Sequence, residues 1–167
     1  YEIGIDDQNL EVIAGTGRYW TRVGSYGSPG CMTDRLIKNS DCENIIVKDT
    51  ESSHWCSKCN KKEECSALAA LVCPITFSNQ IIGTFYLMVF NEKQLNHFVN
   101  NSSELMVFSQ HVANFIASAL KEKSIRNKMT VMANQFKAVI NSVHEGIITI
   151  DNEGKIEKFV DEVEQIS

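Results

Sequence analysis

A helical repeat that runs without a break from about residue 103 to 143 constrains the fold more than any other feature of this chain. Its seam positions follow alternating spacings of three and four, and ten of the twelve are apolar. They are Leu105, Phe108, Val112, Phe115, Ala119, Glu122, Arg126, Met129, Ala133, Phe136, Ile140 and Val143. A helix of this length would span roughly 58 Å, too far to pack wholly against one ordinary domain. We therefore predict that its first half closes a domain core and that the helix forms a homodimer, with Glu122 and Arg126 pairing across the two chains.

Ahead of this helix the sequence has the pattern of a single α/β (α+β) domain. Apolar, β-branched runs bounded by turn residues predict four strands, and one run with helical spacing predicts a helix. The predicted strands are residues 9–16, 44–48, 70–77 and 80–90, and the predicted helix is residues 29–39. Ser78 and Asn79 form a turn between the last two strands, and Gly83 marks a bulge or a close backbone approach. We expect an antiparallel sheet flanked by helices, followed by the long coiled-coil-type helix.

The composition changes again after the long helix. Residues 145–156 have the pattern of a strand, a tight polar turn and the start of another strand. Because a lone hairpin is not stable in water, this segment is predicted to open a further domain. The predicted organisation is a domain over residues 1–102, the long helix over 103–143 and the truncated start of another domain over 144–167.

Charge and composition argue against several functional classes. Sixteen basic and twenty-one acidic residues give a net charge of −5 without a basic stripe, which disfavours direct contact with nucleic acid. No apolar run reaches the ~18 residues of a membrane span and no secretory leader is visible, so we expect a cytoplasmic protein without membrane contact. The Gly15-x-Gly17 turn lacks the other residues of a nucleotide-binding loop, and no acid–base constellation stands out. We therefore do not expect an enzyme.

Four of the six cysteines fall within eighteen residues, and this is the strongest chemical pattern in the chain. They are Cys56, Cys59, Cys65 and Cys73. A Cys-x2-Cys pair followed by a third thiol after five residues can bring three thiolates within ~2.3 Å of one metal. The neighbouring residues are polar, and Lys58, Lys61 and Lys62 would offset the charge of a thiolate cluster. The pattern predicts a zinc or iron–sulfur site.

The fourth ligand is less determined than the first three. Cys73 is our first candidate, although its apolar surroundings suit a core strand equally well. Cys42 is a rival, His54 is a weaker one, and Cys31 is assigned a structural role. Without a metal, the cysteines would be redox-active thiols, a disulfide or inert buried thiols.

Three stretches carry a resemblance to known sensory families. Residues 10–91 resemble the GAF domain, through Val-Ile-Ala-Gly-Thr-Gly-Arg-Tyr at residues 12–19 and through Cys-Pro-Ile at 73–75 leading into residues 81–87. Residues 136–156 resemble the start of a PAS domain, through Val-Ile-Asn-Ser-Val-His-Glu-Gly at 139–146. This order is similar to the sensory region of bacterial sigma-54-dependent activators, some of which carry a Cys-x2-Cys-x5-Cys segment matched here by Cys56, Cys59 and Cys65.

The resemblance implies a regulatory function. In that family, an ATPase domain and a DNA-binding domain follow the sensory region. We expect the chain to sense redox state through the cysteine-ligated centre and to signal through its dimeric helix. The alternative is a metabolite-binding GAF receptor in which the cysteines hold a structural zinc.

Overall fold

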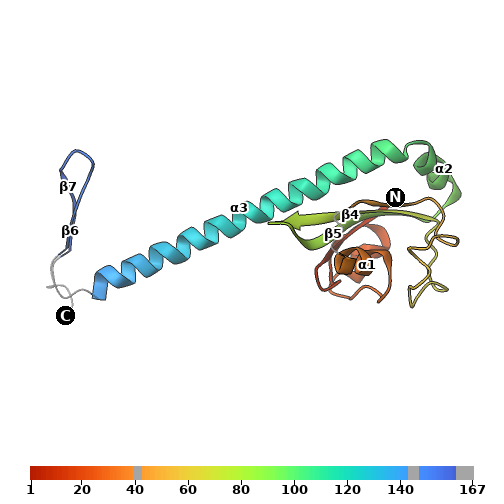
Figure 1. Ribbon diagram of the computed structural model, residues 1–167, viewed down its shortest axis with the longest axis horizontal. Coiled ribbons are helices and arrows are strands. Elements are labelled where there is room, and N and C mark those ends of the chain that lie inside the picture. The colour runs from red at the N-terminus through yellow and green to blue at the C-terminus, as the bar shows by residue number, and fades with distance from the viewer. Residues whose placement is uncertain (40–42, 143–146, 161–167) are drawn as a thin grey trace. The chain divides into compact units, whose positions relative to one another are not determined.

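The computed structural model describes residues 1–39, 43–142 and 147–160, and it divides the chain into two compact units, Tyr1–Lys121 and Glu122–Ser167. The first unit contains a five-stranded antiparallel sheet with the strand order β2-β1-β5-β4-β3 (Figure 1). Its strands are β1 (Glu2–Asp7), β2 (Val12–Gly15), β3 (Ile45–Val47), β4 (Ala69–Phe77) and β5 (Gln80–Val89). The helices are a 3₁₀ helix (Gly17–Arg22), α1 (Met32–Asn39), α2 (Glu92–Asn100) and α3 (Ser102–Ser142). The predicted α/β class with an antiparallel sheet and a long C-terminal helix is confirmed.

The hairpin of β4 and β5 is the centre of the sheet and forms as predicted. Ser78 and Asn79 both have positive φ, 50° and 62°, the backbone that a tight two-residue hairpin requires. The register shifts between Ile75 and Thr76, next to the partner position of Gly83. A Cβ at Gly83 would lie 2.4 Å from the carbonyl oxygen of Asp6 on β1. Gly83 therefore marks both a bulge and a close backbone approach.

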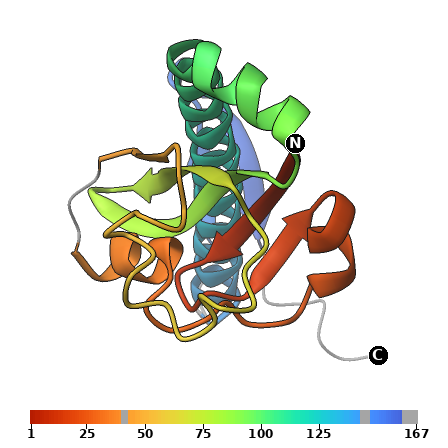
Figure 2. The same cartoon turned by 90° about the vertical axis from the view of Figure 1, so that its right-hand side faces the viewer.

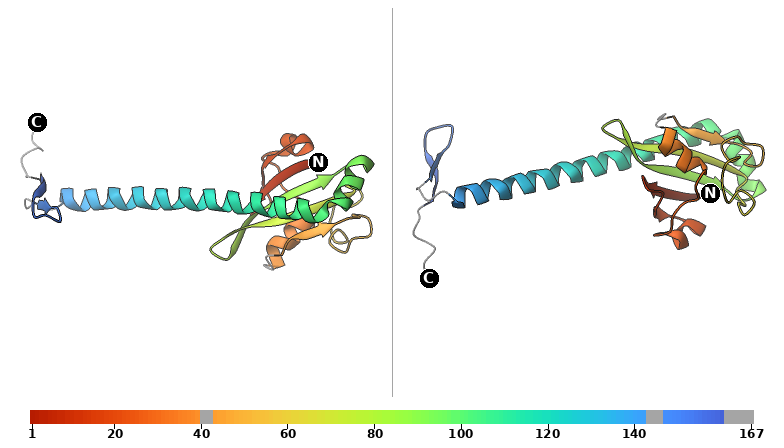
Figure 3. Two further views of the ribbon diagram at one scale, coloured as in Figure 1. Left: turned by 90° about the horizontal axis from the view of Figure 1, so that it is seen from above. Right: turned by 60° about the horizontal axis from the view of Figure 1, so that its bottom comes forward.

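The sheet separates two apolar clusters. Because successive side chains of a strand point to opposite faces, Val72 belongs to one cluster and Cys73 to the other. The first face is covered by α1 and by the loop of residues 48–68, which lie side by side (Figure 2). The second face is covered by α2 and the first part of α3, which lies across β4 and β5 (Figure 3).

The long helix is present almost as predicted, but the face that it buries is different. The residues packed on the sheet are Leu105, Met106, Val112, Ala113, Ile116 and Ala117. Phe108 and Phe115 from the predicted seam are 55% and 74% exposed. Leu105 and Val112 of the predicted seam therefore belong to the core contact. Phe108 and Phe115 do not, because the sheet takes a face of the helix turned away from these two rings. Arg126 bonds Glu122 at 2.5 Å within the same helix, one turn apart.

The sequence prediction missed β1 and α2. The alternating pattern of β1 is short and interrupted by Gly4, so it gives little signal. The prediction correctly ended β5 near Asn91 but overlooked that this asparagine starts a helix. Its side chain accepts a hydrogen bond from the backbone N–H of Gln94 at 2.9 Å, an N-cap.

In the second unit, β6 (Ile147–Ile150) and β7 (Ile156–Val160) form an antiparallel pair, which confirms the predicted strand, turn and strand. The carboxylate of Asp151 accepts the backbone N–H groups of Glu153 and Lys155 in the turn, both at 2.9 Å. Residue 143 of the predicted helix and residues 144–146 and 161–167 of the predicted further domain lie outside the described residues. Among the helices of the described residues, none is both long and apolar enough to span a bilayer.

Candidate functional site: a cavity lined by cysteines

The loop of residues 48–68 carries three of the predicted ligands in a chain of tight turns. The backbone N–H of Cys59 donates to the carbonyl of Cys56 and that of Lys62 to Cys59, both at 3.2 Å. The N–H of Cys65 donates to the carbonyl of Lys62 at 3.1 Å. At the base of the loop, the hydroxyl of Thr50 donates to the carbonyl of Ala67. These local bonds give an irregular segment a defined path across the sheet.

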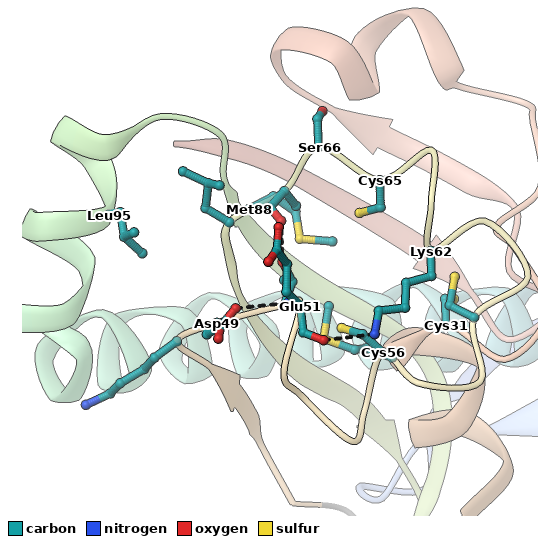
Figure 4. Close-up of a pocket in the computed structure, with 15 residues that line it drawn as sticks. Cys31, Asp49, Glu51, Cys56, Lys62, Cys65, Ser66, Met88 and Leu95 are labelled. Carbon is teal, nitrogen blue, oxygen red and sulfur yellow. Dashed lines mark hydrogen bonds between the residues drawn. The ribbon is translucent and has the colours of Figure 1, made fainter.

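Beneath this loop lies a cavity of about 310 Å³ whose wall is rich in thiols. Four cysteines contribute to it, and Figure 4 shows three of them around the hollow together with Lys62. These four are Cys31, Cys56, Cys59 and Cys65. The ammonium group of Lys62 donates to the carbonyl of Glu51 at 2.8 Å. Two segments distant in sequence therefore supply thiols to one cavity, and a lysine lies among them.

The other predicted ligands do not line this cavity. Cys73 is fully buried on the α3 side of the sheet, where burial raises the pKa of its thiol to about 12. His54 is exposed, with its ring packed against Trp55 at 5.0 Å between centroids. Cys42 lies outside the described residues. The structure thus places Cys56, Cys59 and Cys65 on one cavity with Cys31 and leaves Cys73 on the opposite face, and the metal site stays a prediction.

The surroundings of Cys56 and Cys31 raise the pKa of both thiols and so favour their neutral forms when no cation is bound. Burial raises the pKa of Cys56, and the nearby thiol groups of Cys65 and Cys59 raise it further, while Lys62 opposes them. Burial likewise raises the pKa of Cys31, against a hydrogen bond with the hydroxyl of Thr33. A metal would have to displace these protons, so its binding would be pH-dependent.

The thiols surround the cavity without converging on one point. Among the described residues, no group of three or more His, Cys, Asp or Glu side chains is arranged to hold a metal ion. Thiolate ligands lie ~2.3 Å from zinc, so the cysteine side chains would have to turn inward on binding. The donor set suits zinc or an iron–sulfur cluster, because both prefer sulfur ligands.

A second hollow, of about 390 Å³, borders the first and contains a buried acid. Asp6 is 3% exposed and accepts a hydrogen bond from the hydroxyl of Tyr86 at 2.9 Å. Burial raises the pKa of Asp6 to about 6, although the hydrogen bonds from Tyr86 and Thr33 and the charge of Arg22 oppose the shift. Cys31, Cys59 and Cys65 line this hollow as well. The sequence prediction missed it, because β1 was not recognised as a strand.

The comparisons with solved structures identify the fold of the first unit. The chain superposes on the E. coli DhaR(N)–DhaL complex with a TM-score of 0.56 and 16% identity, over 96% of this chain and 54% of that chain. It matches GAF3 of Slr1393 from Synechocystis (TM-score 0.51, 13% identity, 77% and 86% covered). It also matches the GAF domain of a phosphoenolpyruvate-protein phosphotransferase from Coxiella burnetii (0.50, 15%, 76% and 75%). The first unit has a GAF fold. No protein-family model matches the chain.

One curated protein is similar along most of the chain. It is named as a uric acid sigma-54-dependent transcriptional regulator, UacR, of Escherichia coli strain K12, and is 24% identical over 157 residues. The match covers 93% of this chain and 26% of UacR, so the chain spans about a quarter of that relative. The predicted resemblance to a GAF domain of a sigma-54-dependent regulator is confirmed. The resemblance of residues 136–156 to a PAS domain stays a prediction.

Proposed function

We propose that this chain is the sensory region of a sigma-54-dependent transcriptional regulator and that it senses redox state through a metal or iron–sulfur centre. Cys56, Cys59 and Cys65 are three of the ligands, and a fourth thiol completes the set. The observation that carries the proposal is the gathering of four cysteines on one cavity of a GAF fold. A bound cluster would supply electron-transfer or oxygen-sensitive chemistry, and bound zinc would supply a structural cross-link. We assign the chain no enzymatic activity.

The loop is connected to the helix through the sheet. Its last residues continue directly into β4, and the N–H of Leu68 donates to the carbonyl of Val89 on β5 at 2.7 Å. The opposite face of β4 and β5 packs on α3. A change in the loop on binding or losing the centre would therefore act on strands that contact the helix.

The helix is the route of the signal and the dimer contact in this proposal. Its surface carries large apolar side chains that the described residues do not cover, among them Phe115, Met129, Met132 and Phe136, each at least 66% exposed. A second copy of the chain would bury them as a parallel coil. In the complete regulator, ATPase and DNA-binding domains would receive the signal, in a cytoplasmic protein without membrane contact.

Elemental analysis of protein purified without oxygen tests the centre. Iron with acid-labile sulfide and absorption near ~400 nm would identify a cluster, and one zinc per chain would identify a structural site. Cys59→Ser should abolish the bound metal and leave the circular dichroism spectrum unchanged, because Cys59 lies in the loop. A wild-type chain that carries no iron or zinc and takes up neither on reconstitution would contradict the proposal.

A second candidate function is the binding of a small molecule in the hollow beside Asp6, with the cysteines as a structural zinc site. A buried carboxyl and Arg22 line that hollow, which suits a ligand with both N–H donors and acceptor oxygens. Uric acid, in the name of the similar regulator, has both. A thermal-shift measurement with uric acid tests this, because a ligand stabilises the folded state by mass action. Asp6→Asn should remove the shift; a wild-type protein that shows no shift with uric acid would count against this ligand.

A further inference from the structure

We infer that Cys31 is the fourth ligand of the cysteine centre, so that the centre joins the turn of residues 28–31 to the loop of residues 56–65. This rests on the proposed function and specifies the ligand set. It departs from the sequence prediction, in which Cys73 was the first candidate and Cys31 was structural. Cys31 lies twenty-five residues before Cys56, so cysteine spacing alone does not group it with the other three.

The backbone brings the two segments into direct contact. The N–H of Asn60 donates to the carbonyl of Pro29 at 3.2 Å. Gly30 has a φ of +77°, and a Cβ at this position would lie 2.0 Å from the carbonyl oxygen of Lys58. Only glycine permits both the left-handed backbone and this approach. The residue just before Cys31 is thus packed against the turn that joins Cys56 to Cys59.

Cys31 shares a cavity with each of the other three cysteines. Cys31 lines the same cavity as Cys56, Cys59 and Cys65, and it also lines the second hollow together with Cys59 and Cys65. The Cys31 sulfur lies 3.0 Å from the hydroxyl of Thr33, an exchangeable contact that a metal could replace. For one centre to bind all four, these side chains must rotate so that their sulfurs converge.

Cys73 and His54 are less well placed than Cys31 to bind this centre. Cys73 points to the α3 side of the sheet among apolar residues, so its thiol would have to cross the sheet to reach Cys56. His54 lies on the outside of the loop and is not among the residues that line the cavity. A centre with Cys31 would hold the start of α1 against the loop, since α1 begins at Met32. Loading or losing the metal would then change the contact between α1 and the loop.

Metal binding by three variants tests the assignment. Wild type, Cys31→Ser, Cys59→Ser and Cys73→Ala are prepared without oxygen and titrated with Zn²⁺ against a chelator and with Co²⁺. Cys31→Ser should weaken Zn²⁺ binding at least ~100-fold, more than the loss typical of outer-shell changes. Its thiolate-to-Co²⁺ absorption should also fall, because that intensity follows the number of thiolates. Cys73→Ala, the matched control, should bind as the wild type does.

The outcomes separate the two proposals. Wild-type affinity and Co²⁺ absorption in Cys31→Ser, with binding lost in Cys59→Ser, would overturn the role of Cys31 and leave the centre intact. Loss in Cys73→Ala with retention in Cys31→Ser would restore Cys73 as the ligand. If the wild type binds neither metal and yields no cluster, the centre and the inference both fail.

A labelling experiment on the unmutated chain tests the same assignment and does not depend on the folding of any variant. Native protein is treated with iodoacetamide with and without Zn²⁺, and each cysteine is followed by mass spectrometry. Zn²⁺ should slow the alkylation of Cys31 at least ~10-fold, together with that of Cys56, Cys59 and Cys65. Cys73 should stay unreactive in both samples because it is fully buried. A Cys31 that reacts equally fast with Zn²⁺ bound to the other three would overturn the inference.

Discussion

The two faces of the sheet are covered in different ways. On the α3 side, regular helices bury Leu71, Cys73 and Ile75 of β4 among other apolar residues. On the other side, much of the cover is a loop of successive turns, and it leaves two hollows lined by thiols and charged groups. Because β4 contributes to both faces, its neighbouring side chains point alternately toward the helices and toward the loop. The helix side should therefore govern stability, and the loop side should carry ligand chemistry.

Gly30→Ala should cause the largest loss of stability on the loop side. The added Cβ would collide with the carbonyl oxygen of Lys58, and the alanine backbone would have to keep a positive φ. We therefore expect a loss of about 3 kcal/mol in the free energy of unfolding. Urea denaturation in reductant and chelator measures it. Gly24→Ala is the matched control, because Gly24 has a φ of +82° with nothing within 4 Å of its Cβ position, and it should lose only about 1 kcal/mol. Equal losses would show that the approach of residue 30 to the loop does not matter.

Cys73→Ser tests the helix side and should cost about 2 kcal/mol under the same conditions. The substitution places a hydroxyl at a fully buried position among apolar neighbours, where it has no evident partner. Cys65→Ser is the comparison on the loop side, since Cys65 is exposed and should change the metal-free stability by less than about 0.5 kcal/mol. A loss at Cys65 as large as at Cys73 would remove the distinction between the two faces.

Cys73 and Cys31 show how far sequence reasoning reaches. The hairpin turn at Ser78 and Asn79 and the long helix were predictable, because turn chemistry and helical periodicity are local. The grouping of Cys73 with Cys56 was also based on local spacing, but strand alternation sends the thiol of Cys73 to the far face. Cys31 could not be found by spacing, because its proximity comes from tertiary packing of Gly30 on Lys58. A glycine before a cysteine was the one available hint.

The helix shows a related limit. Periodicity identified α3 but not which of its apolar faces meets the sheet, because Leu105 and Val112 belong to both possible stripes. Phe108 and Phe115 continue the stripe that does not face the sheet. A helix that is apolar on more than one side needs the position of its partner to be known before its buried face can be assigned.

The acid beneath the loop side gives a pH test. The folded-state pKa of Asp6 is about 6, above its ordinary value of 3.8, so the folded chain binds the proton more tightly than the unfolded chain. This stabilisation is complete below pH ~4 and is lost as the pH rises through ~6. Between pH 5 and 7.5 the free energy of unfolding should fall by about 1.4 kcal/mol in wild type relative to Asp6→Asn. Urea denaturation of both proteins at the two pH values measures the difference; parallel behaviour would mean that Asp6 titrates normally.

Phe115→Ser should have the smallest effect on the folding of a single chain, because its ring is 74% exposed on α3. We expect a change within about 0.5 kcal/mol in the free energy of unfolding. If the helix pairs with a second copy through this stripe, each chain loses about 2 kcal/mol of apolar burial. The dimer then loses about 4 kcal/mol, and its dissociation constant should rise roughly 1,000-fold. Analytical ultracentrifugation measures it, with Gln110→Ser as the matched control on an exposed polar position of the same helix. A wild-type chain that stays monomeric throughout, or an equal effect of Gln110→Ser, would mean that this stripe is not the contact between two copies.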